Sequence, residues 1–192
     1  MASASSTNGG KVSEAWRTKV AGTLINPDTL LATDYMNHFN EVVMLIEMLP
    51  DMPDMLPDCA AWKTKSYPQH FLDSRLDYGH LAAEAYEHVP PDIIGPFELT
   101  VAQLNAVIAL TIKRAAAAIA KNASDETRFA VDAGITTLRK LSDTLGGIIN
   151  GSQQTLDQAH IDAMMAGSEL STSLVTTTAC GSTQDDIDKL FD

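Results

Sequence analysis

The sequence of 192 residues contains little cysteine and few basic side chains. Its two cysteines, Cys59 and Cys180, lie far apart and form no Cys-x-x-Cys pair, which argues against a disulfide scaffold and suits a reducing compartment. Lysine and arginine total 13 against 25 acidic residues, so the formal net charge is −12. This charge disfavours nucleic acids and anionic membranes as partners and favours a partner with a basic face.

Targeting and membrane-spanning patterns are also absent from the sequence. Residues 1–12 have neither the cationic start nor the apolar run of a secretory signal peptide, and we expect them to form a disordered leader. No apolar run reaches the ~20 residues that a spanning helix needs, since even 101–120 is interrupted by Gln103, Lys113 and Arg114. The sequence therefore predicts a cytoplasmic protein without a membrane partner, and it leaves the oligomeric state open, a homodimer included.

The chain carries no β-hairpin signal and no β-rich segment, so the predicted fold is all-α. Apolar residues recur with helical spacing over 13–24, 27–49, 98–121 and about 122–146. Asn26 as N-cap and Pro27 at the first helical position predict the start of the second of these helices. Asn122 is the predicted N-cap of the fourth. The short turn before it predicts a long antiparallel helix hairpin, around which we expect a helical bundle over 13–150.

Prolines interrupt the helical pattern between these longer segments. The stretch 49–58 carries three of them, which argues against a regular helix there. Pro68 is expected to open a short helix, and Pro90-Pro91 to end another over 80–89. The prolines thus divide the middle of the bundle into short elements.

The last ten residues carry a compact amphipathic pattern. Ile187, Leu190 and Phe191 are spaced i, i+3 and i+4, so on a helix they share one face. Thr183 can act as N-cap, and the acidic residues that follow favour a helix N-terminus. Because a helix this short is unstable alone in water, 183–192 is predicted to be a docking peptide that folds in a partner's groove. The alternative interpretation is the frayed acidic end of a helix.

The same pattern occurs once more, earlier in the chain. Residues of matching type and spacing make up the two copies: Gln158, Ile161, Asp162, Met164 and Met165 in the first, and Gln184, Ile187, Asp188, Leu190 and Phe191 in the second. The sequence therefore predicts a helical segment with a docking-like motif over 151–167. Residues 168–182 between the copies are rich in Ser and Thr and almost uncharged, which is typical of a flexible linker.

Both copies resemble peptides that bind the response regulator of bacterial chemotaxis. The Gln184 copy resembles the C-terminal tail of the chemotaxis phosphatase, the CheZ family, and the Gln158 copy resembles the N-terminal peptide of the flagellar motor switch protein. In both families the peptide docks on the phosphorylated regulator. The resemblance covers about ten residues per copy. It implies that this chain binds a CheY-like receiver domain in chemotaxis or flagellar motility and needs no cofactor of its own, because Mg²⁺ would be held by the receiver.

The predicted hairpin over 98–149 resembles the phosphatase in outline, but it lacks that family's catalytic motif. The family carries an Asp-x-x-x-Gln pair within a Gln-Asp-x-Thr-Gly-Gln sequence. The nearest match here is Ser142-Asp143-Thr-Leu-Gly-Gly147, with Gly147 in place of the glutamine. No catalytic residue is therefore carried over, and the sequence leaves open whether the protein is an aspartyl-phosphate phosphatase or only a binding protein.

A polar stripe on the predicted 27–49 helix supplies the candidate catalytic residues. Asp34, Asn37 and Glu41, together with His38, follow the i, i+3, i+4, i+7 spacing of one helix face. A carboxamide can orient the water that attacks a phosphoryl group, and an acid can hold the receiver's lysine. The alternative interpretation is the solvated face of an amphipathic helix.

A second polar stripe, His80, Glu84 and His88, favours a structural or surface role. These residues share a helix face, but the first and last are separated by about 12 Å of helix rise, too far for one metal ion. The sequence thus predicts no metal site. The stripe nevertheless motivates an alternative of a different class, a helical metal- or small-molecule-binding bundle with an incidental acidic tail.

Overall fold

The computed structural model describes residues 11–167, and within them the fold is all-α, as the sequence predicts. Its α-helices in chain order are α1 (Glu14–Val20), α2 (Met36–Met48), α3 (Leu56–Ala61), α4 (Tyr67–Asp73), α5 (Gly79–Tyr86), α6 (Pro91–Ile119), α7 (Ser124–Ile149) and α8 (Gln158–Met165). Short 3-10 turns at Thr33–Tyr35 and Pro53–Met55 lead into α2 and α3. Residues 1–10 and 168–192 lie outside the described residues, and with them most of the predicted leader, the linker and the second docking-like segment.

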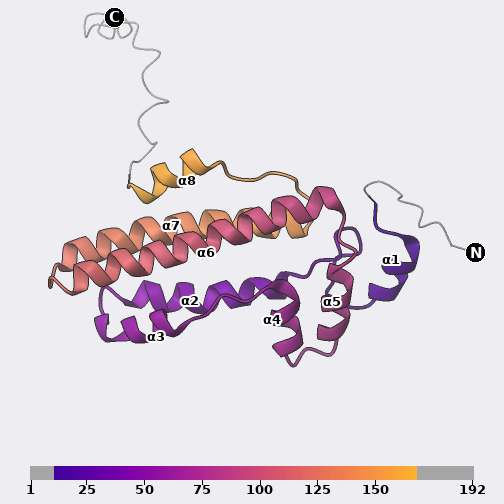
Figure 1. Cartoon of the computed structure of the whole chain (residues 1–192), viewed down its shortest axis with the longest axis horizontal. Coiled ribbons are helices and arrows are strands. Elements are labelled where there is room, and N and C mark those ends of the chain that lie inside the picture. The colour runs from indigo at the N-terminus through magenta and orange to yellow at the C-terminus, as the bar shows by residue number, and fades with distance from the viewer. Residues whose placement is uncertain (1–10, 168–192) are drawn as a thin grey trace, which may run out of the picture.

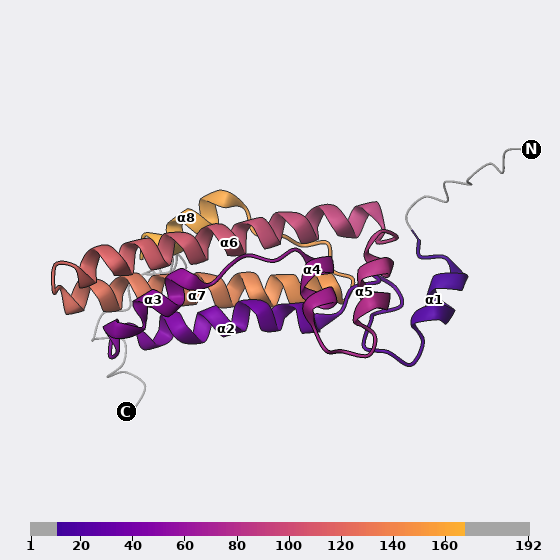
Figure 2. The same cartoon turned by 60° about the horizontal axis from the view of Figure 1, so that its bottom comes forward.

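The bundle is organised on an antiparallel hairpin of α6 and α7, as predicted. The two helices run side by side along the long axis of the molecule (Figure 1). Helix α2 lies along one face of this hairpin and α8 lies on the opposite face (Figures 1 and 2). Helices α4 and α5 pack near the N-terminal end of α6, and α1 lies outside them (Figure 1).

Close packing holds the two hairpin helices together. Leu104 and Ile108 of α6 and Leu138 of α7 are almost completely buried, and burying each such side chain contributes about 1.5–3 kcal/mol. Gly134 of α7 allows an even closer approach to Thr111, because a Cβ at Gly134 would lie only 2.3 Å from the Thr111 Oγ1 atom. The hairpin is therefore a rigid platform whose two outer faces carry the other helices.

The start of α6 differs from the prediction. Pro90-Pro91 does not close a helix over 80–89. Instead α5 ends at Tyr86 and Pro91 opens α6, well before the start predicted from the apolar pattern. Proline is well suited to this position, because its missing N–H would have no partner in the first turn and its φ is already helical. Pro96 follows inside α6, which removes one backbone hydrogen bond there.

The predicted helix over 27–49 is also wrong at its start. Asn26 does not cap a helix; its Oδ1 accepts a hydrogen bond from the Asp28 N–H at 2.8 Å, which forms a tight turn. Leu30 has a left-handed backbone with φ of 62°, and α2 begins only at Met36. The non-helical segment 27–32 buries Leu30 and Leu31 completely, so the predicted apolar side chains enter the core without a helix.

Asn122 ends α6 and does not cap α7. Its φ is 54°, and the Ala123 N–H donates to the Ala118 carbonyl at 3.0 Å, a hydrogen bond typical of a left-handed C-terminal cap. Helix α7 then begins at Ser124 without a side-chain cap. The turn between α6 and α7 is therefore as short as predicted, but Asn122 has the opposite role.

The proline-rich stretch 49–58 contains more helix than predicted. Pro53 opens the 3-10 turn, and Pro57 lies in the first turn of α3, where a missing N–H is tolerated. Cys59 of α3 is buried. This stretch therefore turns the chain at the end of α2 and brings α3 back against α6.

Helix α6 is long and apolar enough, by length and composition, to cross a membrane. The central helix of a folded bundle passes the same test, and almost half of the apolar window of α6 is buried inside the structure. Its buried side chains include Leu104 and Ile108, which pack within the core of the bundle.

Candidate functional site

Aromatic side chains fill the region where α2, α4 and the N-terminal part of α6 meet. The rings of Tyr35, Tyr67 and Phe97 lie 5.3–5.8 Å apart, centroid to centroid. The buried hydroxyls have partners: the Ala32 N–H donates to Tyr67 Oη, and Tyr35 Oη donates to the Lys65 carbonyl, both at 2.8 Å. This cluster fixes α4 and the segment before it against the start of α2.

A polar cleft with a volume of about 430 Å³ opens beside this cluster. It lies between α2 on one side and α4 with the segment before it on the other. Its lining residues combine amide, imidazole, indole, amine and carboxylate groups: Asn37, His38, Glu41, Trp62, Lys63, Lys65, His70, Asp73 and Ser74. This arrangement makes the cleft the best candidate for a functional site among the described residues.

His38 lies at the wall of the cleft in an unusual environment. Its side chain stacks on the Trp62 ring at a centroid distance of 4.7 Å, and the Trp62 Nε1 donates to the His38 carbonyl at 3.2 Å. The residue is only 6% exposed, and its Nε2 has no hydrogen-bond partner within the described part of the chain. An unpartnered buried nitrogen costs free energy, which is a reason to look for a ligand or a catalytic role.

The two histidines of the cleft are uncharged at neutral pH. Burial lowers the pKa of His38 to about 4, and repulsion from the protonated form of His70 and from Lys65 adds to this effect. Burial also lowers the pKa of His70, whose ring centroid lies 6.0 Å from that of His38. The cleft therefore offers two neutral imidazoles, each of which can accept a proton or a hydrogen bond.

The structure brings two of the three predicted catalytic residues to this cleft. Asn37 and Glu41 line it from exposed positions on α2. Asp34 instead lies in the 3-10 turn and accepts a hydrogen bond from Tyr78 Oη at 2.6 Å, so it holds α5 and its preceding loop against the start of α2. Burial, then the contact with Asp34, raises the pKa of Tyr78, so this tyrosine stays a donor.

Sequence reasoning missed most of the other residues of the cleft. His70 comes from α4, and Lys63 and Lys65 come from the segment between α3 and α4. Lys65 is paired with Asp73 at 2.8 Å, which fixes one edge of the cleft. The one local signal was His38, whose position in the polar stripe did not reveal that it would be buried.

The predicted stripe is only partly helical, because His80 and Glu84 lie on α5 and His88 lies in the turn after it, and two of the three residues have structural contacts. Glu84 pairs with Lys19 of α1 at 2.6 Å, and the His88 ring lies 4.5 Å from the Trp16 ring, centroid to centroid. These contacts attach α1 to the rest of the bundle. Within residues 11–167, no three His, Cys, Asp or Glu side chains come together as a metal site.

The first copy of the repeated motif forms α8. Asp157 caps the helix by accepting from the His160 N–H at 2.8 Å, and the exposed Gln158 and Asp162 are joined by a hydrogen bond at 2.8 Å. The apolar side chains follow the predicted face: Ile161 and Met165 are 2–3% exposed and Met164 is partly buried. In this structure that face packs on the chain's own hairpin, so these side chains can meet a partner only if α8 is released. The partner-binding residues predicted in 183–192, namely Gln184, Ile187, Asp188, Leu190 and Phe191, lie outside the described residues.

Comparison of the chain with protein-family models, curated proteins and solved structures finds no match. The interpretation of the site thus depends on its own residues. On these grounds two features carry functional weight: the cleft between α2 and α4, and the repeated motif whose first copy is α8.

Proposed function

We propose that this chain is a chemotaxis or motility signalling protein that binds a phosphorylated CheY-like response regulator through residues 183–192. The observation that carries the proposal is the duplicated motif. Its first copy forms a capped helix with the apolar residues on one face and the acidic and amide residues exposed. This supports the same conformation for the second copy when it is placed in a groove of suitable shape.

The binding energy would come from three apolar anchors, Ile187, Leu190 and Phe191. Each buried anchor contributes on the order of 1.5–3 kcal/mol. Removing two of them should therefore weaken binding by at least about 100-fold, since 1.4 kcal/mol corresponds to a factor of ten. The tether 168–182 would keep the peptide close to the bundle while it is bound to the receiver.

The experiment is a titration of the full-length protein against the receiver domains of its source organism, each with and without phosphorylation. The Ile187→Ala, Phe191→Ala double variant should lose most of its binding to the phosphorylated receiver. Lys189→Ala is the matched control, because position 189 lies on the opposite helix face. If the wild-type protein binds none of these receivers, the proposal is wrong.

The proposal has a catalytic part, in which the bundle accelerates loss of the receiver's phosphoryl group. The supporting arrangement is the pair Asn37 and Glu41 at the cleft. The carboxamide would orient the attacking water and the carboxylate would hold the receiver's lysine, while the bound tail keeps the two proteins together. Asp34 is left out of this part, because its carboxylate is engaged by Tyr78.

A second candidate function is the binding of a small molecule in the cleft, and the unpartnered Nε2 of His38 favours it. A ligand that donates a hydrogen bond to this nitrogen and carries a negative group toward Lys63 would fit the lining. Native mass spectrometry and metal analysis of untagged protein distinguish the two. A stoichiometric ligand or metal, together with no receiver binding, would favour the second function.

A further inference from the structure

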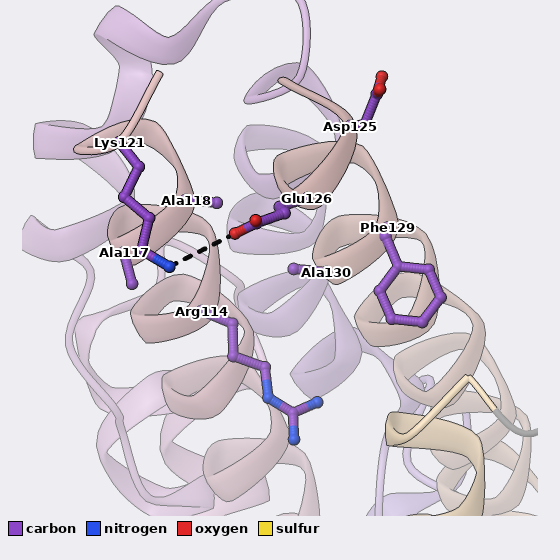
Figure 3. Close-up of a pocket in the computed structure, with 8 residues that line it drawn as sticks. All are labelled: Arg114, Ala117, Ala118, Lys121, Asp125, Glu126, Phe129 and Ala130. Atoms are coloured by element: carbon purple, nitrogen blue, oxygen red, sulfur yellow. Dashed lines mark ion pairs between the residues drawn. The ribbon is translucent and has the colours of Figure 1, made fainter. Parts of the chain in front are cut away.

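The groove on the α8 side of the hairpin is longer than α8 itself. Arg114 marks the end of α8, because its guanidinium donates to the Met165 carbonyl at 2.6 Å. Beyond this point the groove continues toward the α6–α7 turn as a hollow of about 630 Å³. Figure 3 shows its two walls, with Arg114 and Lys121 on α6 and Phe129 on α7.

The floor of this hollow consists of small side chains. The buried Ala118 of α6 lies opposite Ala130 of α7, the exposed Ala117 lies beside Lys121 at the α6 edge, and the Phe129 ring stands at the α7 edge. Phe129 is 59% exposed, which is unusual for a large apolar side chain in a folded bundle. An alanine floor beside an exposed aromatic ring is a surface on which an apolar helix face can pack closely.

The hollow has the length of a two-turn helix. Arg114 and Lys121 are seven residues apart on α6, which corresponds to about 10 Å of helix rise. An eight-residue helix such as α8 is about 12 Å long. The stretch of groove between Arg114 and Lys121 therefore has nearly the length of one more helix of the size of α8, whose last residue would lie beside the α6–α7 turn.

The chain leaves α8 directly at the mouth of this hollow. Gly167 has a φ of 68°, and a Cβ there would lie 2.4 Å from Cζ of Phe129. From this point 168–182 could reach ~50 Å when extended, at about 3.3 Å per residue. Residues 183–192 can thus reach any part of the groove without strain.

We propose that residues 183–192 dock in this hollow of the same chain, end to end with α8. The second motif copy has a suitable residue at each position with which α8 is capped or packed. Thr183 corresponds to the capping Asp157, and the three apolar residues of the tail correspond to those that pack α8 on the hairpin. The apolar face of the tail lies on the alanine floor and against Phe129. The hairpin groove therefore holds both copies of one motif in succession.

Charge and the covalent tether also favour this occupant over a separate protein. The acidic side chains of the tail can face Arg114 and Lys121, and Lys121 is engaged only in a long, exposed ion pair of 3.5 Å with Glu126. A tethered peptide needs little affinity, because a flexible link of this length gives an effective concentration in the millimolar range.

The docked tail hides the three apolar residues that the proposed function assigns to the receiver. The receiver and the groove then compete for the tail. The apparent affinity for the receiver is the intrinsic affinity multiplied by the fraction of molecules whose tail is free. This consequence rests on the proposed function, whereas the docking itself does not. Docking in cis would make the tail a regulated ligand whose release sets the strength of signalling.

The test compares NMR spectra of full-length wild type and the Ile187→Ala, Phe191→Ala variant, with no receiver present. We expect chemical-shift differences at Ala117, Ala118 and Phe129, unchanged on dilution. Lys189→Ala, the matched control, should leave these signals in place.

Three results would overturn the proposal. If the NMR signals of the residues that line the hollow are identical in the wild type and in the double variant, the tail does not dock there. Differences confined to Ile161 and Met165 mean that the tail exchanges with α8, and differences that disappear on dilution mean that it docks on a second copy. Ala117→Glu, which places a large charged group at the α6 edge of the hollow, must shift the tail signals toward those of the free 183–192 peptide. Because no receiver is used, these results are independent of the receiver titration.

Discussion

The buried His38 makes a specific prediction about the pH dependence of stability. The pKa of His38 is about 4 in the folded protein, whereas the ordinary value of 6.5 applies to the unfolded chain. Between pH 4 and pH 6.5 the unfolded chain therefore binds a proton that the folded chain does not. Stability then rises with pH across this window and is constant above it. On acidification from pH 7, the protein should therefore lose stability between about pH 6.5 and pH 4.

The expected magnitude follows from the size of the pKa shift. The folded and unfolded values differ by roughly 2.5 pH units, and each unit corresponds to 1.36 kcal/mol, which gives about 3 kcal/mol in total. Typical domains are stable by only 5–15 kcal/mol. A loss of this size lowers the melting temperature of a chain of this length by roughly 6–12 °C.

The assay is urea unfolding at a series of pH values between 4 and 7.5, with the difference between wild type and His38→Phe as the readout. The carboxylates and His70, whose pKa burial also lowers, are present in both proteins, so their effect cancels in the difference. His80→Gln, a change at an exposed histidine of α5, is the control. If wild type and His38→Phe lose stability equally between pH 6.5 and 4, the burial argument for His38 is refuted.

Two further predictions concern the hairpin and the cleft. Gly134→Ala forces a Cβ to 2.3 Å from Oγ1 of Thr111 and should destabilise the protein by about 1–3 kcal/mol in urea unfolding. Gly95→Ala is the control, because the space around its Cβ is open, and it should be neutral or stabilise the protein by up to about 1 kcal/mol. Equal effects of the two changes on the free energy of unfolding would contradict the close packing at Gly134. Asn37→Ala should slow loss of the receiver's phosphoryl group by about 100-fold without weakening receiver binding. Asn40→Ala, a change at another exposed asparagine of α2, should leave the rate of phosphoryl loss unchanged. If the phosphorylated receiver decays equally fast with wild type and with Asn37→Ala, the cleft has no part in the mechanism.

Local sequence patterns predicted the helical class and the α6–α7 hairpin because these depend on periodicity and a short turn. They failed at the start of α2, which tertiary hydrogen bonds determine. The Ala32 N–H is bound by Tyr67 Oη, and Thr29 Oγ1 donates to the Ile149 carbonyl at 2.7 Å. Both partners are distant in sequence, so a favourable N-cap signal at Asn26 was outweighed by contacts that no local window contains.

The candidate site was predictable only where one helix face defines it. Asn37 and Glu41 follow from helical spacing, and the structure places both at the cleft. His70 and Lys65 reach the same cleft from other segments, and their proximity depends on how α4 folds back on α2. The burial of His38 also depends on this packing, because Trp62 from the following segment covers its ring.

The two tryptophans lie in different parts of the protein, so their intrinsic fluorescence can report on two regions separately. Trp62 is stacked on His38 at the cleft, and Trp16 lies against His88 where α1 meets α5. The sequence contains no other tryptophan, so each emission signal can be assigned by replacing the other indole with phenylalanine. Emission from Trp62 then reports changes at the cleft, such as protonation of His38, and emission from Trp16 reports the contact between α1 and the residues after α5, without any added label.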